Sequence, residues 1–172
     1  MEYSQKKNSS QRKRKFWIEY KMKKSNIFGT SDKRKVNPDW FTNKTWMKVL
    51  SDKIKSKDQD IYHVHFEKGS KTKLHLHNGN QVLIATKGKG SLEIFRKYGS
   101  SKSNFKIKKI QKIALNEGDV VHIPAKTLHT HGSIDKKKTF SHIAINILPR
   151  TNAVYKTIWY ESDFKTRVSE IV

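Results

Sequence analysis

Residues 69–88 read GSKTKLHLHNGNQVLIATKG, with histidines at 75 and 77 and a glutamine at 81. Side chains alternate between the two faces of a strand, so His75 and His77 would point to the same side. Asn78-Gly79-Asn80 is a turn sequence, and a hairpin there would bring Gln81 back across from both histidines. Two imidazoles and an amide on one face predict a metal site that needs one more imidazole.

A later stretch of the chain can supply that imidazole. Residues 118–124 read GDVVHIP, and His129 and His131 follow, again two positions apart. His122 has the opposite parity in a separate predicted strand, so we leave it out of the site.

Another histidine pair, His63 and His65, offers a competing metal site. On the same predicted strand, Tyr62, Val64 and Phe66 share the opposite face. The mostly apolar face should be the buried one, so we expect these two histidines to point outward, away from the metal.

Residues 140–147 predict a strand with two very different faces. One face carries isoleucine at 143, 145 and 147, and the other carries His142, Ala144 and Asn146. Three isoleucines need cover, whereas the small polar face can line a pocket. His142 is equally compatible with a hydrogen-bonded interior histidine that has no further role.

The chain as a whole fits one domain with an extension. Nine or ten short predicted strands separated by turn residues indicate a small all-β barrel, and not alternating strands and helices. We expect a basic, partly disordered N-terminal extension over residues 1–37, the folded domain over residues 38–164, and a tail over residues 165–172.

Composition excludes several classes of protein. The 172 residues contain no cysteine, so neither disulfides nor thiolate metal sites are possible. No apolar run is long enough to span a bilayer, and the N-terminal region lacks a signal-peptide core, so we expect a cytoplasmic protein without membrane contact.

The charge is strongly positive, at +22, with 37 Lys and Arg against 15 Asp and Glu. Residues 1–37 hold twelve of the basic and three of the acidic residues, so +9 lies there and +13 in the remainder. A nucleic-acid or acidic ligand is one interpretation. Only six of the 37 basic residues are arginine, the better phosphate reader, so we favour a lysine-rich composition with weak, salt-sensitive nucleic-acid binding at most.

The spacing of these residues resembles the two motifs of the cupin superfamily. The first, G-x5-H-x-H-x(3,4)-E-x6-G, matches at residues 69–88 with Gln81 in place of glutamate. The second, G-x5-P-x-G-x2-H-x3-N, matches at Gly118, Pro124 and His129, with Lys126 in place of a glycine. The resemblance implies a cupin jelly roll, a double-stranded β-helix. Lys126 must then avoid a positive φ or accept strain.

Within that superfamily the chain looks like the single-domain branch of bacterial cupin-type hydroxynitrile lyases and proteins grouped with carboxymuconolactone decarboxylases. The branch reads H-x-H-P-x-G-Q, H-W-H-G, T/S-H-L-A-I-Q and F-T-G-x-x-W. Here the corresponding stretches are HLHNGNQ at 75–81, HTHG at 129–132, SHIAIN at 141–146 and FTNKTW at 41–46.

The resemblance implies roles for individual residues. The metal would be held by His75, His77, Gln81 and His129. The open coordination positions would face His131 and His142, as acid, base or hydrogen-bonding groups. The substrate pocket would be shaped by Tyr62, Val64, Leu83 and Asn146. Three imidazoles and an amide oxygen suit one divalent Mn, Fe, Ni, Co or Zn ion per chain. The resemblance also implies a homodimer with exchanged or packed N-terminal strands.

Three functions remain open at this point. The first is a metal-dependent lyase that makes or cleaves a C–C bond in a small hydroxylated or carbonyl compound, such as a cyanohydrin. The second is a cupin dioxygenase with a redox-active metal. The third is a non-catalytic cupin that binds a small ligand or nucleic acid.

Overall fold

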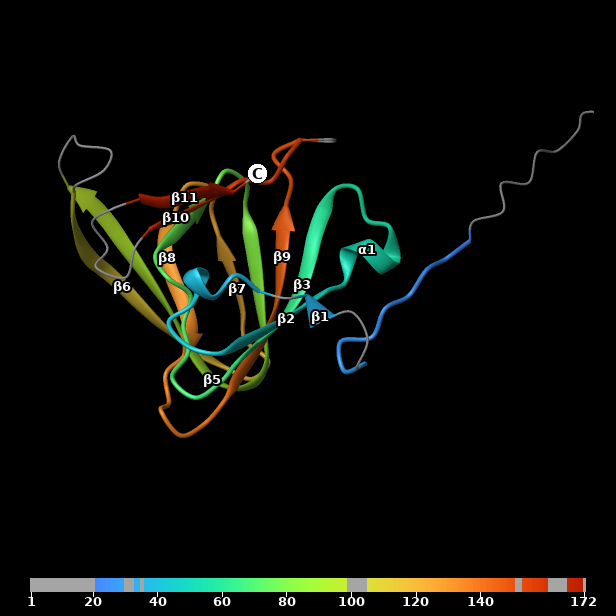
Figure 1. Cartoon of the computed structure of the whole chain (residues 1–172), viewed down its shortest axis with the longest axis horizontal. Coiled ribbons are helices and arrows are strands. Elements are labelled where there is room, and N and C mark those ends of the chain that lie inside the picture. Colours follow the sequence, from blue (N-terminus) through green and yellow to red (C-terminus); the bar gives the residue numbers. More distant parts are fainter. Residues whose placement is uncertain are drawn as a thin grey trace, which may run out of the picture.

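The computed structural model describes residues 21–29, 33–34, 36–98, 105–150, 153–160 and 167–171, the short stretches 33–34 and 167–171 by their backbone. Most of the basic, partly disordered extension predicted for residues 1–37 lies outside these residues. The described chain is an all-β jelly roll, as the sequence predicts: one curled antiparallel sheet forms a half-barrel (Figure 1).

The strands follow one another with little helix between them. They are β1 Lys33–Arg34, β2 Thr45–Val49, β3 Gln59–Phe66, β4 His75–His77, β5 Gln81–Tyr98, β6 Lys106–Asn116, β7 Val120–Ile123, β8 Leu128–Ser133, β9 Phe140–Ile147, β10 Thr157–Tyr160 and β11 Arg167–Ile171. A 3-10 turn, Pro38–Trp40, precedes β2, and the four-residue helix α1, Ser51–Ile54, follows it. Among the described residues no helix is long and apolar enough to cross a bilayer.

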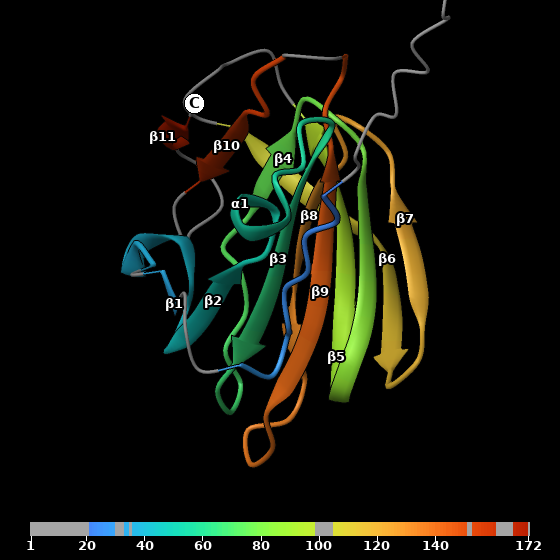
Figure 2. The same ribbon diagram turned by 90° about the vertical axis from the view of Figure 1, so that its right-hand side faces the viewer.

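Strand β5 organises the sheet. The neighbouring strands run in the order β1-β2-β3-β9-β5-β8-β4-β10-β11, and β6 and β7 also pair with β5. The first half of β5 pairs with β9 and β7, and the second half pairs with β8 and β6. Because one long strand serves both sides, the sheet curls around a single interior, as the two views show (Figures 1 and 2).

Gly88-Lys89-Gly90 is a second turn sequence, and both chain reversals expected from the sequence, there and at Asn78-Gly79-Asn80, are wrong. Residues 81–98 form one continuous strand, so the chain does not reverse at Gly88-Lys89-Gly90. It bends there instead, because the register shifts after Ala85 and Gly88 has φ +74°; a Cβ on Gly88 would lie 2.3 Å from the Thr139 carbonyl oxygen. Likewise β4 and β5 do not form a hairpin. Strand β4 pairs with β8 and β10, so Asn78-Gly79-Asn80 carries the chain across the barrel.

The predicted faces of the other strands are confirmed. In β9 the side chains of His142, Ala144 and Asn146 are buried, whereas Ile147 on the opposite face is 39% exposed. In β3, His63 and His65 lie on the outward face, where they hydrogen-bond to Thr86 and Ser141. The apolar residues Ile107, Ile110 and Ile113 change parity between 107 and 110, which predicts a bulge, and Ile110 is indeed skipped in the pairing with β5.

Two apolar clusters stabilise the described fold. The larger fills the inside of the half-barrel, and its buried members are Phe41, Val64, Phe66, Leu83, Ala85, Leu92, Leu115, Ile123, Phe140 and Ala144. The smaller lies among β4, β8, β10 and the start of β6, and contains Leu74, Phe105, Leu128 and Tyr160. Burying such side chains contributes about 1.5–3 kcal/mol each.

The segment before the predicted domain boundary contacts the sheet. The amine of the buried Lys48 donates to the carbonyl oxygens of Asn26 and Gly29. The boundary near residue 37 stays a prediction, and this contact argues for placing part of residues 21–29 with the folded domain.

Candidate metal centre

Three buried histidines from two paired strands form a cluster inside the barrel. His75 of β4 lies directly opposite His129 of β8 in the antiparallel register, and His131 follows on the same face of β8. Each offers one ring nitrogen, and these nitrogens all lie within 4.8 Å of one another. Three imidazole nitrogens at that spacing are positioned to bind a metal ion.

Backbone carbonyls fix the orientation of two of these rings. Nδ1 of His75 donates to the Lys73 carbonyl oxygen, and Nδ1 of His129 donates to the Thr127 carbonyl oxygen, both at 2.8 Å. A carbonyl only accepts, so each Nδ1 carries the proton and each Nε2 keeps its lone pair. Nε2 of His129 is buried and has no hydrogen-bond partner. Both rings are therefore in the tautomer that a metal needs.

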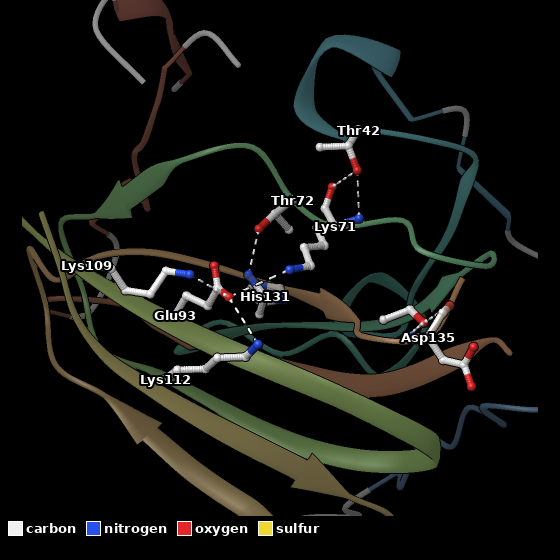
Figure 3. A network of polar contacts seen from close by, with 9 residues as sticks. Thr42, Lys71, Thr72, Glu93, Lys109, Lys112, His131 and Asp135 are labelled. Carbon is white, nitrogen blue, oxygen red and sulfur yellow. Dashed lines mark hydrogen bonds and ion pairs between the residues drawn. The ribbon is translucent and has the colours of Figure 1, made fainter. Parts of the chain in front are cut away.

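The third ring, His131, is held by different neighbours. Its backbone N–H donates to the Thr72 hydroxyl oxygen at 2.9 Å, which Figure 3 shows. Its Nδ1 lies 3.1 Å from Nε2 of His142, and both of these rings are fully buried. If Nε2 of His131 holds a metal, Nδ1 donates to His142, and the proton of neutral His142 then lies on its own Nδ1.

Next to the cluster, His77, Gln81 and Asn146 form a second polar group. The Gln81 amide nitrogen donates to Nε2 of His77 at 3.2 Å and to Oδ1 of Asn146 at 2.8 Å. Nδ1 of His77 therefore carries the proton, and it lies 2.9 Å from the Thr157 hydroxyl. The Gln81 amide oxygen is left buried without a partner, which is the state expected of a ligand oxygen.

The structure thus brings all the sequence-predicted metal and proton-transfer residues together, with a different grouping. His131, which the resemblance placed beside the metal, lies with His75 and His129 in the cluster. His77 lies at its edge, with ring centroids 4.9 Å from His75 and 5.4 Å from His129. Metal binding by His77 and Gln81 stays a prediction.

Burial keeps these imidazoles neutral. Desolvation, followed by the neighbouring imidazoles, lowers the pKa of His75, His77 and His131 well below the ordinary 6.5. Burial also lowers the pKa of His129 to about 4 and that of His142 to about 3. Neutral imidazole is the form that binds metal, so the site needs no deprotonation at neutral pH.

A cavity of about 400 Å³ opens beside the cluster and is lined by His75, His77, His131 and His142. Tyr62, Val64 and Asn146, which were expected to shape a pocket, line it as well. Leu83 is not among the lining residues. It is 1% exposed and packs in the larger apolar cluster, because β5 carries it below Gln81 into the core.

The sequence reading missed the aromatic wall of this cavity. The Trp159 ring stacks on His75, with centroids 4.5 Å apart, and the Trp40 ring stacks on Trp159 at 5.4 Å. Tyr155 lies against His77, with ring centroids 5.0 Å apart. Alternation in β10 was the available signal, since Trp159 shares its face with Thr157.

The segment before β4 packs against β8, the strand that carries His129 and His131. Lys71 bridges to Gly132, and the Thr72 N–H donates to the His131 carbonyl oxygen at 2.8 Å. A Cβ on Gly132 would lie 2.5 Å from the Lys71 Cα, so this close approach requires glycine. The glycine that ends HTHG therefore serves strand packing.

On the outer side of β5, a carboxylate forms ion pairs with lysines. Glu93 of β5 meets Lys109 at 3.0 Å and Lys71 and Lys112 at 3.7 Å (Figure 3). Burial alone would raise the pKa of Glu93, but the hydrogen bond from Lys109 and the charges of the three lysines lower it overall.

The structure is a jelly-roll β-barrel with three buried histidines positioned to bind a metal ion. The chain belongs to the cupin family, since residues 27–165 match the family model described as Cupin. The comparison with curated proteins found no match.

Solved structures agree with this family. A cupin-like protein from Thermotoga maritima is 30% identical, with a TM-score of 0.58 over 80% of this chain and 90% of that one. A vicilin from Solanum melongena is 13% identical, with a TM-score of 0.56 over 80% of this chain and 34% of the vicilin. A 7S globulin from Momordica charantia is 12% identical, with a TM-score of 0.53 over 74% of this chain and 35% of the globulin. The two plant proteins share the fold alone.

Proposed function

We propose that this cupin is a metal-dependent enzyme that cleaves or forms a C–C bond in a small hydroxylated or carbonyl compound. The observation that carries the proposal is the convergence of neutral, buried imidazoles on one point in the wall of a cavity. Nε2 of His129, one of these imidazoles, is buried and unpaired, and so is Oε1 of Gln81. Such atoms are costly in a folded protein unless something binds them.

The donor set fits one divalent transition metal ion. Nitrogen from His75, His129 and His131 and an amide oxygen from Gln81 suit Mn, Fe, Ni, Co or Zn. All these ligands are neutral, since glutamine stands where the family motif has glutamate, so an ion would keep its full positive charge. When bound, it would supply Lewis acidity toward an alkoxide or enolate oxygen.

The residues of the chain would supply proton transfer. His142 lines the cavity and contacts His131 through Nε2, while its Nδ1 is buried without a partner. A histidine held this way can pass a proton to or from a substrate atom in the cavity. Because His131 is proposed as a metal ligand, we propose His142 as the group that transfers the proton.

Cleavage of mandelonitrile tests this proposal. Protein reloaded with manganese should release benzaldehyde, metal-free protein should not, and His142→Gln should be slower by about 10²-fold or more, the usual effect of a lost proton carrier. Equal rates in all three would refute the proposed lyase. Oxygen uptake by the iron-loaded protein would instead support a dioxygenase, and ligand binding without turnover would support a non-catalytic cupin.

We further propose a homodimer through the outer face of β9. Ile143 and Ile145 on that face pair with Ile84 and Val82 of β5, and Val120 on the next strand is 66% exposed. The positions named here on β5, β7 and β9 are apolar, so two chains of charge +22 can approach there with less repulsion than at the lysine-rich surfaces. Sedimentation should give a dimer at micromolar concentration, and Ile145→Lys should give a monomer. A wild-type monomer would refute this interface.

A further inference from the structure

A groove of about 410 Å³ lies on the reverse side of the strands that carry the metal centre. Side chains alternate between the two sides of a sheet, so the groove is lined by residues next in sequence to those of the metal centre and its cavity. They are Leu76 of β4, Leu128 of β8 and Tyr160 of β10. The groove and the metal cavity share no lining residue.

Most of the residues that line the groove are apolar. Leu76, Phe95, Leu128 and Tyr160 all belong to the smaller apolar cluster or pack against it. Ile110 of β6 also lines the groove, and its side chain is 48% exposed on a strand that is rich in lysine. An apolar molecule gains free energy by covering such a surface.

The charged residues that line the groove are all basic, and all are exposed: Arg96, Lys97 and Lys126. In the described part of the chain Arg96 and Lys126 take part in no ion pair, whereas two lysines of β6 are paired with Glu93 (Figure 3). The Lys97 amine lies 4.3 Å from the centroid of the Phe105 ring, a contact that leaves its charge in place. Uncompensated positive charge therefore lies beside the apolar surface.

Two departures from regular backbone place side chains at this groove. Ile110 is the residue skipped in the pairing of β6 with β5, and such a bulge re-aims a side chain. Lys126 adopts φ +64°, a conformation that is unfavourable for lysine and not for glycine. Strained backbone of this kind gathers at functional sites. The groove thus takes its exposed isoleucine and one of its cations from the two irregular positions.

Charge and volume narrow the class of ligand. A cation would be repelled, and a purely neutral apolar molecule would leave the positive charges without a partner. A polyanion such as nucleic acid needs cations spread along an extended track, whereas these surround one hollow. The bounded volume likewise favours a free molecule over the extended surface of a bilayer.

We infer that this groove binds a free apolar carboxylate, with its body against Phe95, Ile110 and Leu128 and its anionic group held by Arg96 and Lys126. The planar guanidinium of arginine can donate two hydrogen bonds to one carboxylate, and the lysine adds a point charge. The site is independent of the proposed lyase, because the two sites share no lining residue.

Decanoate binding to full-length, metal-free protein tests the inference. Titration calorimetry should detect binding to wild type at millimolar concentration, and added salt should weaken it, because the cations are exposed. In amide NMR spectra the resonances of residues 94–97 and 126–128 should shift. No binding, or shifts confined to residues 142–146 beside the metal cavity, would overturn the inference.

Lys126→Gly separates binding from stability. It should raise the melting temperature, since the strain at φ +64° is relieved, and weaken decanoate binding by about threefold, the usual scale for one exposed charge pair. Ile110→Asp should weaken binding by about tenfold, because it removes apolar contact and adds a like charge. Unchanged affinity in both variants would overturn the inference.

Lys108→Gln is the matched control. Lys108 is an exposed lysine directly opposite Arg96 in the strand register, and it does not line the groove. Its loss should change decanoate affinity less than Lys126→Gly does. Decyltrimethylammonium, with the same chain and the opposite charge, should not bind, and equal binding of the two amphiphiles would overturn the role of the cations. Binding to vesicles of anionic lipid without binding of decanoate would overturn the inference in favour of a membrane surface.

Discussion

The inner side of β8 and the outer side of β5 keep buried titratable groups in opposite charge states. Inside, His129 and His131 are buried with other imidazoles, and desolvation keeps them neutral. Outside, Glu93 stays ionised because three lysines surround it. Glu93 of β5 pairs with Thr130 of β8, the residue between the two histidines, so the groups lie one position apart in the sheet register. Glu93 and the histidines are all buried, so the neighbouring groups, three lysines on one side and other imidazoles on the other, decide whether a buried group stays ionised or neutral.

The largest expected effect is loss of metal from the inner side. Purified protein should carry about one transition metal per chain, and His75→Ala combined with His77→Ala should abolish it, because ligands from β4 are then gone. His63→Ala combined with His65→Ala, on the outward face of β3, should retain it. Elemental analysis decides, and the reverse pattern would place the metal elsewhere.

Single variants sharpen the ligand assignment. His131→Ala should lose more metal than His77→Ala if the grouping of His75, His129 and His131 holds the ion. A greater loss from His77→Ala would instead favour the ligand set implied by the family motif.

The next effect is acid destabilisation of metal-free protein. Unfolded histidines take up protons below about pH 6.5, whereas folded His129 does so only near 4 and His142 only near 3. The unfolded state therefore binds more protons in that window, so stability falls as pH drops from about 6.5 to 4, by about 1.4 kcal/mol per pH unit for each such histidine. Urea unfolding across this range measures the slope, and His142→Gln should reduce it. A flat profile would mean that the histidines are not buried in solution.

A smaller loss of stability is expected when a side chain is added where the segment before β4 contacts β8. Gly132→Ala places a Cβ where Lys71 and Ser70 approach, so it should destabilise the fold by about 1–3 kcal/mol. Since β8 must shift, metal content should fall as well. Gly118→Ala has nothing within 4 Å of its Cβ and isolates the strain of its φ of +93°. Equal metal content in Gly132→Ala and wild type would argue against strand packing as the reason for this glycine.

Replacing Lys126, in the turn between β7 and β8, should stabilise the protein. Lys126 adopts φ +64°, the strained outcome expected where the family motif has glycine. Lys126→Gly should therefore stabilise the protein by about 1 kcal/mol, which thermal unfolding can measure. A loss of stability would show that the Lys126 side chain contributes more than the strain costs.

The smallest effects belong to the outer ion pairs. The lysines around Glu93 are partly exposed, so each pair should contribute about 0.2–1 kcal/mol and weaken in salt. Lys109→Ala, at 3.0 Å, should cost more than Lys112→Ala, at 3.7 Å. Urea unfolding at low and high salt tests this order, and a cost that does not change with salt would point to packing of the lysine stems.

Much of the site could be predicted because it depends on local spacing. Alternation along a strand placed His75 with His77, His129 with His131, and His142 with Ala144 and Asn146, and each pair or trio does share an inward face. The same rule turned His63 and His65 outward. Gly69, Gly118 and Pro124 occur at the spacing of the two cupin motifs. They predict the barrel without any strand pairing, because turn residues act locally.

The tertiary structure decided which strands are neighbours, and the sequence could not. Asn78-Gly79-Asn80 reads as a hairpin turn, yet β4 pairs with β8 and β10, since only the curled sheet brings those strands together. Gly88 reads as a turn residue, yet its positive φ bends β5 around the barrel. For the same reason, Trp40 and Tyr155 reach the cavity from opposite ends of the chain. Spacing fixes the face on which a side chain lies, but partners across the sheet depend on long-range pairing, which no local pattern encodes.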